Sequence, residues 1–272
     1  MKKHLSTIIM IGVFILGLGL ILYPSVSNYW NSLHQSRAIT TYSEAVNSLG
    51  DDEYNDILNA AKRYNNVISQ RGDTRLLDPQ TLSDYNKLLN PSGNGIMAHI
   101  EIPSINVSLP VYHGVSDAVL QIAVGHLDWS ALPVGGESTH CVLSGHRGLP
   151  SAKLFTNLDK LVEGDIFMLH VLKETFTYQV DQVLIVEPQE TESLNIIKGG
   201  DYCTLVTCTP YGINSHRLLV RGHRIDNLQE GDILAITAEA TQIDPVLVAP
   251  VVAVPFLLML FVYVMIKYRK RR

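Results

Sequence analysis

A cysteine and an arginine stand nine positions apart in a segment that has the parts for acyl-transfer chemistry. The stretch TLVTCTPYGINSHRLLVRG places Cys208 at the end of one apolar run and Arg217 at the start of the next. The residues TPYG that follow the run are typical of a turn. If the two runs pair as a hairpin, Arg217 returns to the level of Cys208. A guanidinium there can hold a carbonyl, or the oxyanion that a thiolate creates.

His146 is the candidate base for this thiol. It lies in the stretch VLSGHRGLP, where a run of strand-forming residues meets a glycine-rich turn. Such a position can present an imidazole at the rim of a barrel, and a cysteine needs a base or counter-ion to react as a thiolate. His216, directly before Arg217, is a rival base. The order His146 then Cys208 disfavours a papain-like hydrolase, because those enzymes place the cysteine early and the histidine late.

Together these two stretches resemble the sortases, and specifically the class C sortases, the pilin-polymerising transpeptidases of Gram-positive bacteria. The stretches HLDWSALPVGGESTH and IEIPSINVSLPVYHG support the match, which covers roughly residues 95–230. The resemblance implies that Cys208 is the nucleophile, that His146 is the acid and base, and that Arg217 is the oxyanion and substrate ligand.

The resemblance also implies a reaction. Cys208 would cleave an LPxTG-like sorting signal between Thr and Gly and form a thioester. A lysine amine of another pilin would then resolve it, so the partners would be pilin subunits that carry a sorting signal and an acceptor lysine. Two alternatives stay open: a housekeeping-type sortase that attaches surface proteins to the cell wall, and a non-catalytic pilus assembly scaffold.

No cofactor or metal is expected. Of the ten histidines, His140, His216 and His223 are the nearest candidates for a metal site, but their spacings form no recognised zinc pattern. We therefore expect them to be surface or strand-end histidines. The acidic run at residues 51–53 suits the first turn of a helix, so it does not require calcium.

Class C sortases also carry a lid, marked by Asp-Pro followed by an aromatic residue. The nearest match here is Asp78-Pro79-Gln80, in which Gln80 replaces the aromatic ring. Asp78 is therefore a lid candidate that could reach Arg217, with no ring beside Cys208. The alternative is an ordinary Asp-Pro that ends a helix.

The pattern from residue 96 onward is that of strands. Apolar residues alternate with polar ones in short segments rich in Val, Ile, Thr and Tyr, separated by Gly and Pro, which favours a barrel or a sandwich. With the resemblance, the expected fold is mainly β: a closed sortase-type barrel of about eight strands with short helices, over residues 96–232. The expected strands are 96–102, 107–112, 139–144, 166–172, 175–187, 202–208 and 218–225, with a short helix at 154–161.

A helical arm is expected before the barrel, over residues 28–95. Ser43-Glu44 could start one helix, and Asp51–Gln70 reads as another, with acidic residues in its first turn and Gly72 just past its end. The turn-forming stretch NPSGNG then ends the arm. After the barrel, residues 233–245 are expected to be a linker.

Both ends of the chain predict membrane helices. Residues 5–23 and 246–266 contain no charged side chain, and lysines or arginines flank both on the side of the terminus. Because positive flanks stay in the cytoplasm, we expect a two-span cell-membrane protein with an extracellular catalytic domain, cytoplasmic termini and a basic tail at 267–272. Residues 1–27 serve as the anchor. Cleavage as a signal peptide after the small residues at 25–27 is the alternative.

Composition narrows the class of protein. The chain has 272 residues, of which 46% are hydrophobic, and this excludes a disordered tail. Residues 24–245 hold all 26 acidic residues against 14 basic ones, a net charge of −12. That balance gives no nucleic-acid signature and would suit a basic, lysine-presenting partner. The three cysteines leave at least one free thiol, and Cys141 and Cys203 are expected to be packing residues.

Overall fold

A computed structural model describes residues 2–71, 76–229 and 245–270 of the chain. The chain forms two compact units. One draws on the two ends of the chain and on Pro150–Ala152, and the other comprises the remainder from Ser32 onward. The larger unit holds every strand.

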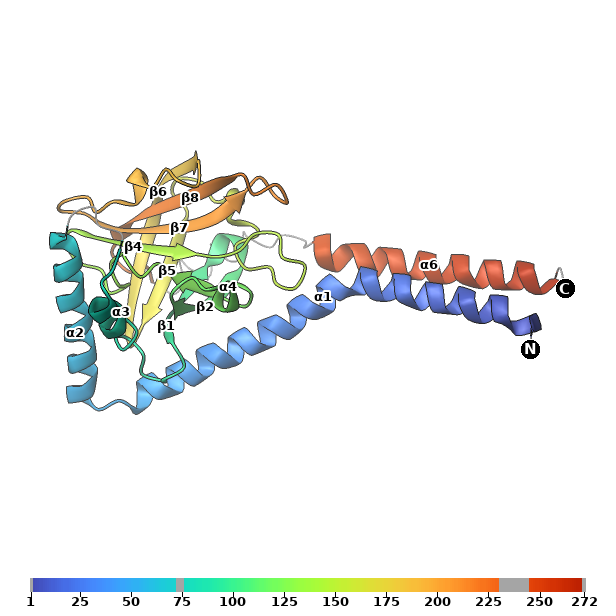
Figure 1. Cartoon of the computed structure of the whole chain (residues 1–272), viewed down its shortest axis with the longest axis horizontal. Helices are drawn as coiled ribbons and strands as arrows, with labels where there is room; N and C mark the ends of the chain where they lie inside the picture. The colour runs from blue at the N-terminus through green and yellow to red at the C-terminus, as the bar shows by residue number, and fades with distance from the viewer. Residues whose placement is uncertain (1, 72–75, 230–244, 271–272) are drawn as a thin grey trace. The chain divides into compact units, whose positions relative to one another are not determined.

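The larger unit is built on a closed barrel of eight strands (Figure 1). Around the barrel the strands follow the order β1-β2-β3-β4-β7-β8-β6-β5. Pairs β2–β3 and β4–β7 are parallel, and the other neighbours are antiparallel. The strand bounds are β1 Ile96–Ile102, β2 Val107–His113, β3 Val124–His126, β4 Thr139–Ser144, β5 Ile166–Val171, β6 Glu174–Val186, β7 Asp201–Thr209 and β8 His216–Ile225.

Period-two alternation explains why these segments form the barrel. In β1, Ile96, Ala98, Ile100 and Ile102 are fully buried, whereas the residues between them include half-buried polar side chains. A strand points successive side chains to opposite faces, so one face fills the barrel and the other covers its outside. The predicted closed barrel of about eight strands is confirmed.

Two expectations for the barrel differ from the structure. Strand β3 was not predicted, because three residues are too few to show an alternating pattern. The helix expected at 154–161 is only a 3-10 turn, η2 Leu158–Lys160. Leu154 has a φ of 37°, a left-handed conformation that cannot start a right-handed helix. Two further 3-10 turns are η1 Pro103–Ile105 and η3 Glu192–Leu194.

The arm contains part of α1 together with α2 and α3, whereas α4 lies between β2 and β3. One expectation about the arm is wrong. Helix α1 runs without interruption over Lys2–Ser48, so no helix starts at Ser43-Glu44. Residues 25–48 hold neither glycine nor proline, and nothing ends the helix before Gly50. Helix α2 is Asp51–Gln70, as predicted, while Gly72 lies outside the described residues. Helices α3 Pro79–Tyr85 and α4 Asp117–Leu120 are shorter.

Polar contacts fix the arm to the barrel. The buried Asn65 side chain of α2 donates to the carbonyl oxygen of Leu132 at 3.0 Å and accepts from its N–H at 2.7 Å. The Tyr42 hydroxyl of α1 donates to the carbonyl oxygen of Met97 at 2.9 Å and accepts from the N–H of Leu172 at 2.8 Å. Tyr42 therefore joins β1 to the residue that follows β5.

The smaller unit contains the first part of α1 and helix α6, Pro245–Lys270. Both helices are long and apolar enough to cross a membrane, and their apolar side chains are largely exposed. The rings of Phe14 and Phe261 stack with centroids 4.3 Å apart, so the two helices lie side by side (Figure 1). Apart from Pro245, the linker expected at 233–245 falls outside the described residues.

Replacement of Tyr42 by phenylalanine tests the contact between α1 and the barrel. Tyr42→Phe leaves a buried N–H and a buried carbonyl oxygen without partners, which costs about 1–3 kcal/mol for each such group. We expect the melting temperature of the full chain in detergent to fall by several degrees. Tyr54→Phe is the matched control, because its hydroxyl bonds the exposed Glu174. Equal melting temperatures for the two variants would contradict the role of Tyr42.

Candidate active site

Strand register brings the three predicted catalytic residues to one end of the barrel. Cys208 of β7 lies directly opposite Arg217 of β8 in an antiparallel pair, so their side chains share a face. The last parallel pair between β4 and β7 joins Ser144 to Val206. Two residues beyond this pair come His146, in the loop after β4, and Cys208, still on β7.

Hydrogen bonds continue this pairing past the end of β4. The N–H of Gly145 donates to the carbonyl oxygen of Val206 at 3.1 Å, and the Thr207 hydroxyl donates to the carbonyl oxygen of Gly145 at 2.7 Å. The chain therefore still follows β7 when it reaches His146. Residues that are 62 positions apart in the sequence are thus held at the same level of the sheet.

Cys208 differs from the other two cysteines in exposure. Cys208 is half-buried, whereas Cys141 and Cys203 are buried, and all three are free. Cys203 lies on the inward face of β7, so it points away from the face of Cys208, as the five-residue spacing predicts. Burial raises the pKa of Cys203 well above its usual value, so this thiol stays neutral.

An apolar floor lies next to Cys208 on the same face of the sheet. Val206 and Leu219 form a pair two residues away from the pair of Cys208 and Arg217. Val142 of β4 belongs to the same buried cluster. Four half-buried side chains pack against this cluster: Leu127, Trp129, Leu184 and Val186. The cluster itself is buried, and these four side chains are the part of it that solvent reaches. The sequence did not single it out, because its members come from separate strands and loops.

The turn between β7 and β8 holds Arg217 in place. Pro210 offers its carbonyl oxygen to the N–H groups of Ile213 at 3.1 Å and Asn214 at 2.9 Å, which closes the predicted turn. The Arg217 guanidinium donates to the carbonyl oxygens of Asn214 at 3.3 Å and His216 at 3.1 Å. These backbone contacts orient the guanidinium without neutralising its charge.

The loop that carries His146 is tied down on both sides. The carbonyl oxygen of His146 accepts from the N–H of Phe155 at 3.1 Å. The next residue, Arg147, donates to the Thr209 hydroxyl at 3.1 Å and to the Asp159 carboxylate at 2.5 Å. Arg147 therefore links the histidine loop to the residue that follows Cys208. The contact joins residues that are 62 positions apart, so no local sequence pattern predicts it.

The lid candidate Asp78 has partners of its own. It caps the N-terminus of α3 by accepting from the N–H of Thr81 at 3.0 Å, and it accepts from the Thr81 hydroxyl at 2.6 Å and from Arg71 at 2.8 Å. These contacts, with the Thr81 hydrogen bonds first, hold the pKa of Asp78 well below its usual value. Asp78-Pro79 therefore starts a helix, and the alternative that it ends one is wrong. A lid role for Asp78 stays a prediction.

The histidines considered for a metal do not gather at one site. His140 is buried, and its ring contacts the carbonyl oxygen of Asn195 at 2.9 Å and the Thr204 hydroxyl at 2.7 Å. Burial lowers its pKa, so it packs as a neutral ring. His216 is exposed at the β7–β8 turn and contacts Ser215. These environments favour structural or surface roles.

This arrangement of a half-buried cysteine on a closed barrel is that of the cysteine transpeptidase barrels, and comparison with known proteins gives the same class. A sortase-domain family model matches residues 100–225. The solved structure of sortase C1 from Streptococcus agalactiae is 52% identical, with a TM-score of 0.69, over 71% of this chain and 100% of that one. Sortase C from Streptococcus pneumoniae is 42% identical, with a TM-score of 0.62, over 70% and 97%.

The chain therefore belongs to the sortase family, whose members are cysteine transpeptidases. Class C sortases are among its structural neighbours. A more distant relative is sortase D of Bacillus subtilis, 31% identical over 129 residues. That match covers 46% of this chain and 62% of the relative, less than two thirds of its length.

Replacement of Gly145 by alanine tests how tightly the histidine loop is packed. A Cβ atom at Gly145 would lie 2.7 Å from the ring of the buried Phe155. Such overpacking costs about 1–3 kcal/mol, so we expect Gly145→Ala to lower the melting temperature. Because the loop beside Cys208 would be displaced, we also expect a changed rate of Cys208 alkylation. Gly17→Ala is the control, because a Cβ there meets nothing within 4 Å. If Gly145→Ala melts and reacts like the unsubstituted chain, the loop is not held as described.

Proposed function

We propose that this chain is a class C sortase that polymerises pilins. The observation that carries the proposal is the strand register: Cys208 pairs with Arg217, and β4 pairs with β7 up to Ser144, two residues before His146. Sequence identities of 42–52% to class C enzymes support it. The structure of the Streptococcus pneumoniae enzyme provides insights into pilin substrate specificity.

In the first half of the proposed reaction, the Cys208 thiolate attacks the Thr carbonyl carbon of an LPxTG-like sorting signal. Arg217 stabilises the negative charge that develops on the carbonyl oxygen; one such donor is commonly worth about 10²–10³ in rate. The Thr–Gly bond then breaks. His146 gives its proton to the leaving amine, and the acyl group remains on Cys208 as a thioester.

In the second half, the side-chain amine of a pilin lysine attacks the thioester. His146 takes a proton from that amine, and the Cys208 thiolate leaves as the new isopeptide bond forms. The enzyme returns to its starting state, and no cofactor or metal takes part in the proposed steps. Repetition joins one pilin to the next.

The apolar floor gives the sorting signal a place to bind. Val206 and Leu219 lie two residues from Cys208 and Arg217 on the same face. A peptide extended beside this face would meet the half-buried side chains that pack on the floor: Leu127, Trp129, Leu184 and Val186. The Leu and Pro of the signal precede the Thr that is attacked. Their burial would supply binding energy and fix the Thr carbonyl beside the thiol.

The proposed location follows from the two apolar helices. Both terminal helices meet the length and composition of a membrane span, and basic residues stand at the terminal side of each. Positive flanks stay in the cytoplasm. We therefore place the catalytic barrel outside the cell, where its net negative surface would attract a lysine-presenting pilin.

Co-expression with a pilin separates this function from its alternatives. With the unsubstituted chain we expect a ladder of covalent pilin polymers that resists SDS, and with Cys208→Ala we expect only monomers. Cys141→Ala is the matched control, because it removes a buried thiol on a neighbouring strand and should leave the ladder intact. Monomers joined to the wall with the unsubstituted chain would indicate a housekeeping sortase. A ladder that persists in Cys208→Ala would indicate a scaffold.

Labelling of Cys208 tests the lid. Asp78→Ala removes the cap of α3 and the contact with Arg71, so we expect the arm to loosen and the rate of Cys208 alkylation to rise several-fold. Asp84→Ala is the control, since Asp84 is an exposed acid on the same helix. A lower melting temperature with an unchanged alkylation rate would show that Asp78 only caps α3.

A further inference from the structure

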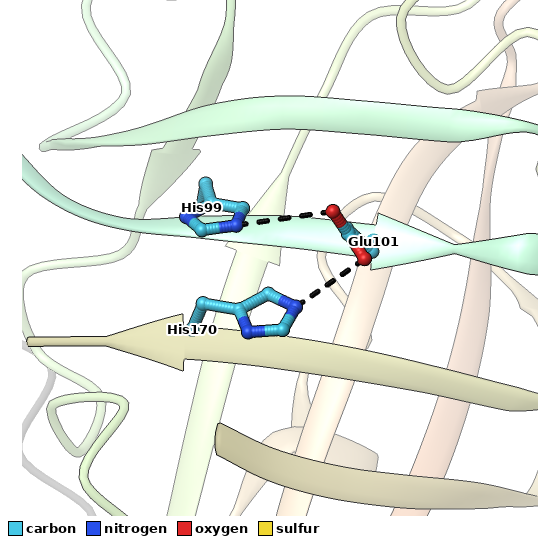
Figure 2. Close-up of side chains that lie close together, drawn as sticks. All are labelled: His99, Glu101 and His170. Atoms are coloured by element: carbon cyan, nitrogen blue, oxygen red, sulfur yellow. Dashed lines mark ion pairs between the residues drawn. The ribbon is translucent and has the colours of Figure 1, made fainter. Parts of the chain in front are cut away.

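We propose that His99, Glu101 and His170 form a binding site for a divalent transition-metal ion such as Zn²⁺. Figure 2 shows the three side chains turned toward one another, His99 and Glu101 from β1 and His170 from β5. Glu101 Oε1 lies 3.9 Å from His99 Nε2, and Glu101 Oε2 lies 3.4 Å from His170 Nε2. One ligand atom from each residue falls within 4.8 Å of the other two.

Strand geometry produces this cluster. His99 and His170 are direct partners in the antiparallel pair of β1 and β5, and Glu101 follows two residues after His99 on the same face. The two imidazole rings stack with centroids 4.3 Å apart and 15° between their planes. The alternating pattern of β1 sends His99 and Glu101 to the outside of the barrel, because Ile100 and its apolar neighbours fill the inside. His170 shares that face because it pairs directly with His99.

Two imidazole nitrogens and one carboxylate oxygen are ligands that suit Zn²⁺ and its neighbours in the first transition row. Bond lengths of about 2.0–2.2 Å place tetrahedral ligand atoms about 3.4 Å from one another. The contact between His170 and Glu101 already has that separation. A modest rotation of the His99 ring would bring its Nε2 atom to the same distance.

The hydrogen bonding of the cluster is incomplete without a further group. His99 Nδ1 is buried and has no hydrogen-bond partner among the described residues, and the buried His170 Nε2 has only its 3.4 Å contact with Glu101. His170 Nδ1 lies 3.0 Å from the Thr175 hydroxyl, which fixes the ring with Nε2 toward Glu101, as outer partners of metal-bound histidines do.

An ion could reach this site from solvent. The side chains of His99 and His170 are 16% and 24% exposed, whereas that of Glu101 is 41% exposed. Glu101 therefore forms the open side of the cluster, and water could complete the coordination there. The sequence shows no zinc spacing, because His170 is brought in by a different strand.

The place of the cluster in the fold indicates a structural role. In the ring of strands, the β1–β5 seam lies opposite the β4–β7 pair that carries the active site. Only three residue pairs join β1 to β5, and Tyr42 of α1 bridges the same two segments through Met97 and Leu172. An ion held by both strands would stabilise the closure of the barrel and the packing of α1 against it.

Metal titration of the untagged full chain in detergent tests the proposal. All variants carry Cys208→Ala, so that this thiol cannot bind the ion, and each is first treated with EDTA. Free Zn²⁺ at 100 times its Kd raises the folding equilibrium constant about 100-fold, which corresponds to a rise in melting temperature of about 5–10 °C. We expect this rise in the Cys208→Ala chain and its loss in His99→Gln and Glu101→Gln.

His223→Gln is the matched control, because His223 is a half-buried strand histidine outside the cluster. It should keep the full rise. Co²⁺ provides a second readout: we expect visible absorption bands of tetrahedral Co²⁺ that vanish in Glu101→Gln, a substitution on the exposed side that should not prevent folding. Equal rises in all variants would place the ion elsewhere, and no rise in the parent would leave a His170–Glu101 ion pair only; either result overturns the proposal.

Discussion

The parallel pairing of β4 with β7 is the constraint on which the rest of the site depends. A histidine and a cysteine that are 62 residues apart can share chemistry only if their strands run in the same direction and in the right register. Six residue pairs, from Thr139 with Asp201 to Ser144 with Val206, fix that register. A parallel pair needs a long crossover, and here the crossover supplies β5 and β6, which close the barrel. The crossover that supplies these strands also leads the chain back to pair β7 with β4 in this register.

Short tethers carry this alignment from the strands to the side chains. Arg147 joins the loop after β4 to Thr209 at the end of β7, and Phe155 packs against the backbone that precedes His146. The Arg147 side chain is only 9% exposed, and its Nε atom is buried with no hydrogen-bond partner among the described residues. Burying such a cation is costly unless it is paired, and Asp159 provides the pair. The Nε atom of Arg147 still lacks a hydrogen bond within the described part of the chain, which lowers the stability of the fold beside His146.

Much of the fold could be predicted from the sequence, because its information is local. The alternation in β1 and the turn residues after Cys208 determine the strands and the hairpin, and the acidic first turn of α2 marks where that helix begins. The hairpin in turn predicts that Arg217 faces Cys208. In contrast, β3 is too short for a periodic signal, and α1 continues where a new helix was expected because the sequence has no strong stop there.

What the sequence could not show are contacts between strands that are distant in the chain. The apolar floor combines β4, β7 and β8, the Arg147 tether joins two loops, and the histidine cluster joins β1 to β5. Each depends on register, which the sequence specifies only through the whole set of alternating residues. The resemblance to sortases supplied the role of His146, which the residues alone left as one base among two.

The order of strands also separates the part of the barrel that holds the reacting residues from the part that binds α1. The reacting residues lie around β4, β7 and β8, and the seam that receives α1 lies at β1 and β5, on the opposite side of the ring. Free-energy changes at sites that share no partners are close to additive. A change at Tyr42, or at the histidine cluster beside it, therefore alters how firmly the barrel closes without altering the chemistry at Cys208. Attachment to the anchor helix and reactivity can vary independently, because different pairs of strands carry them.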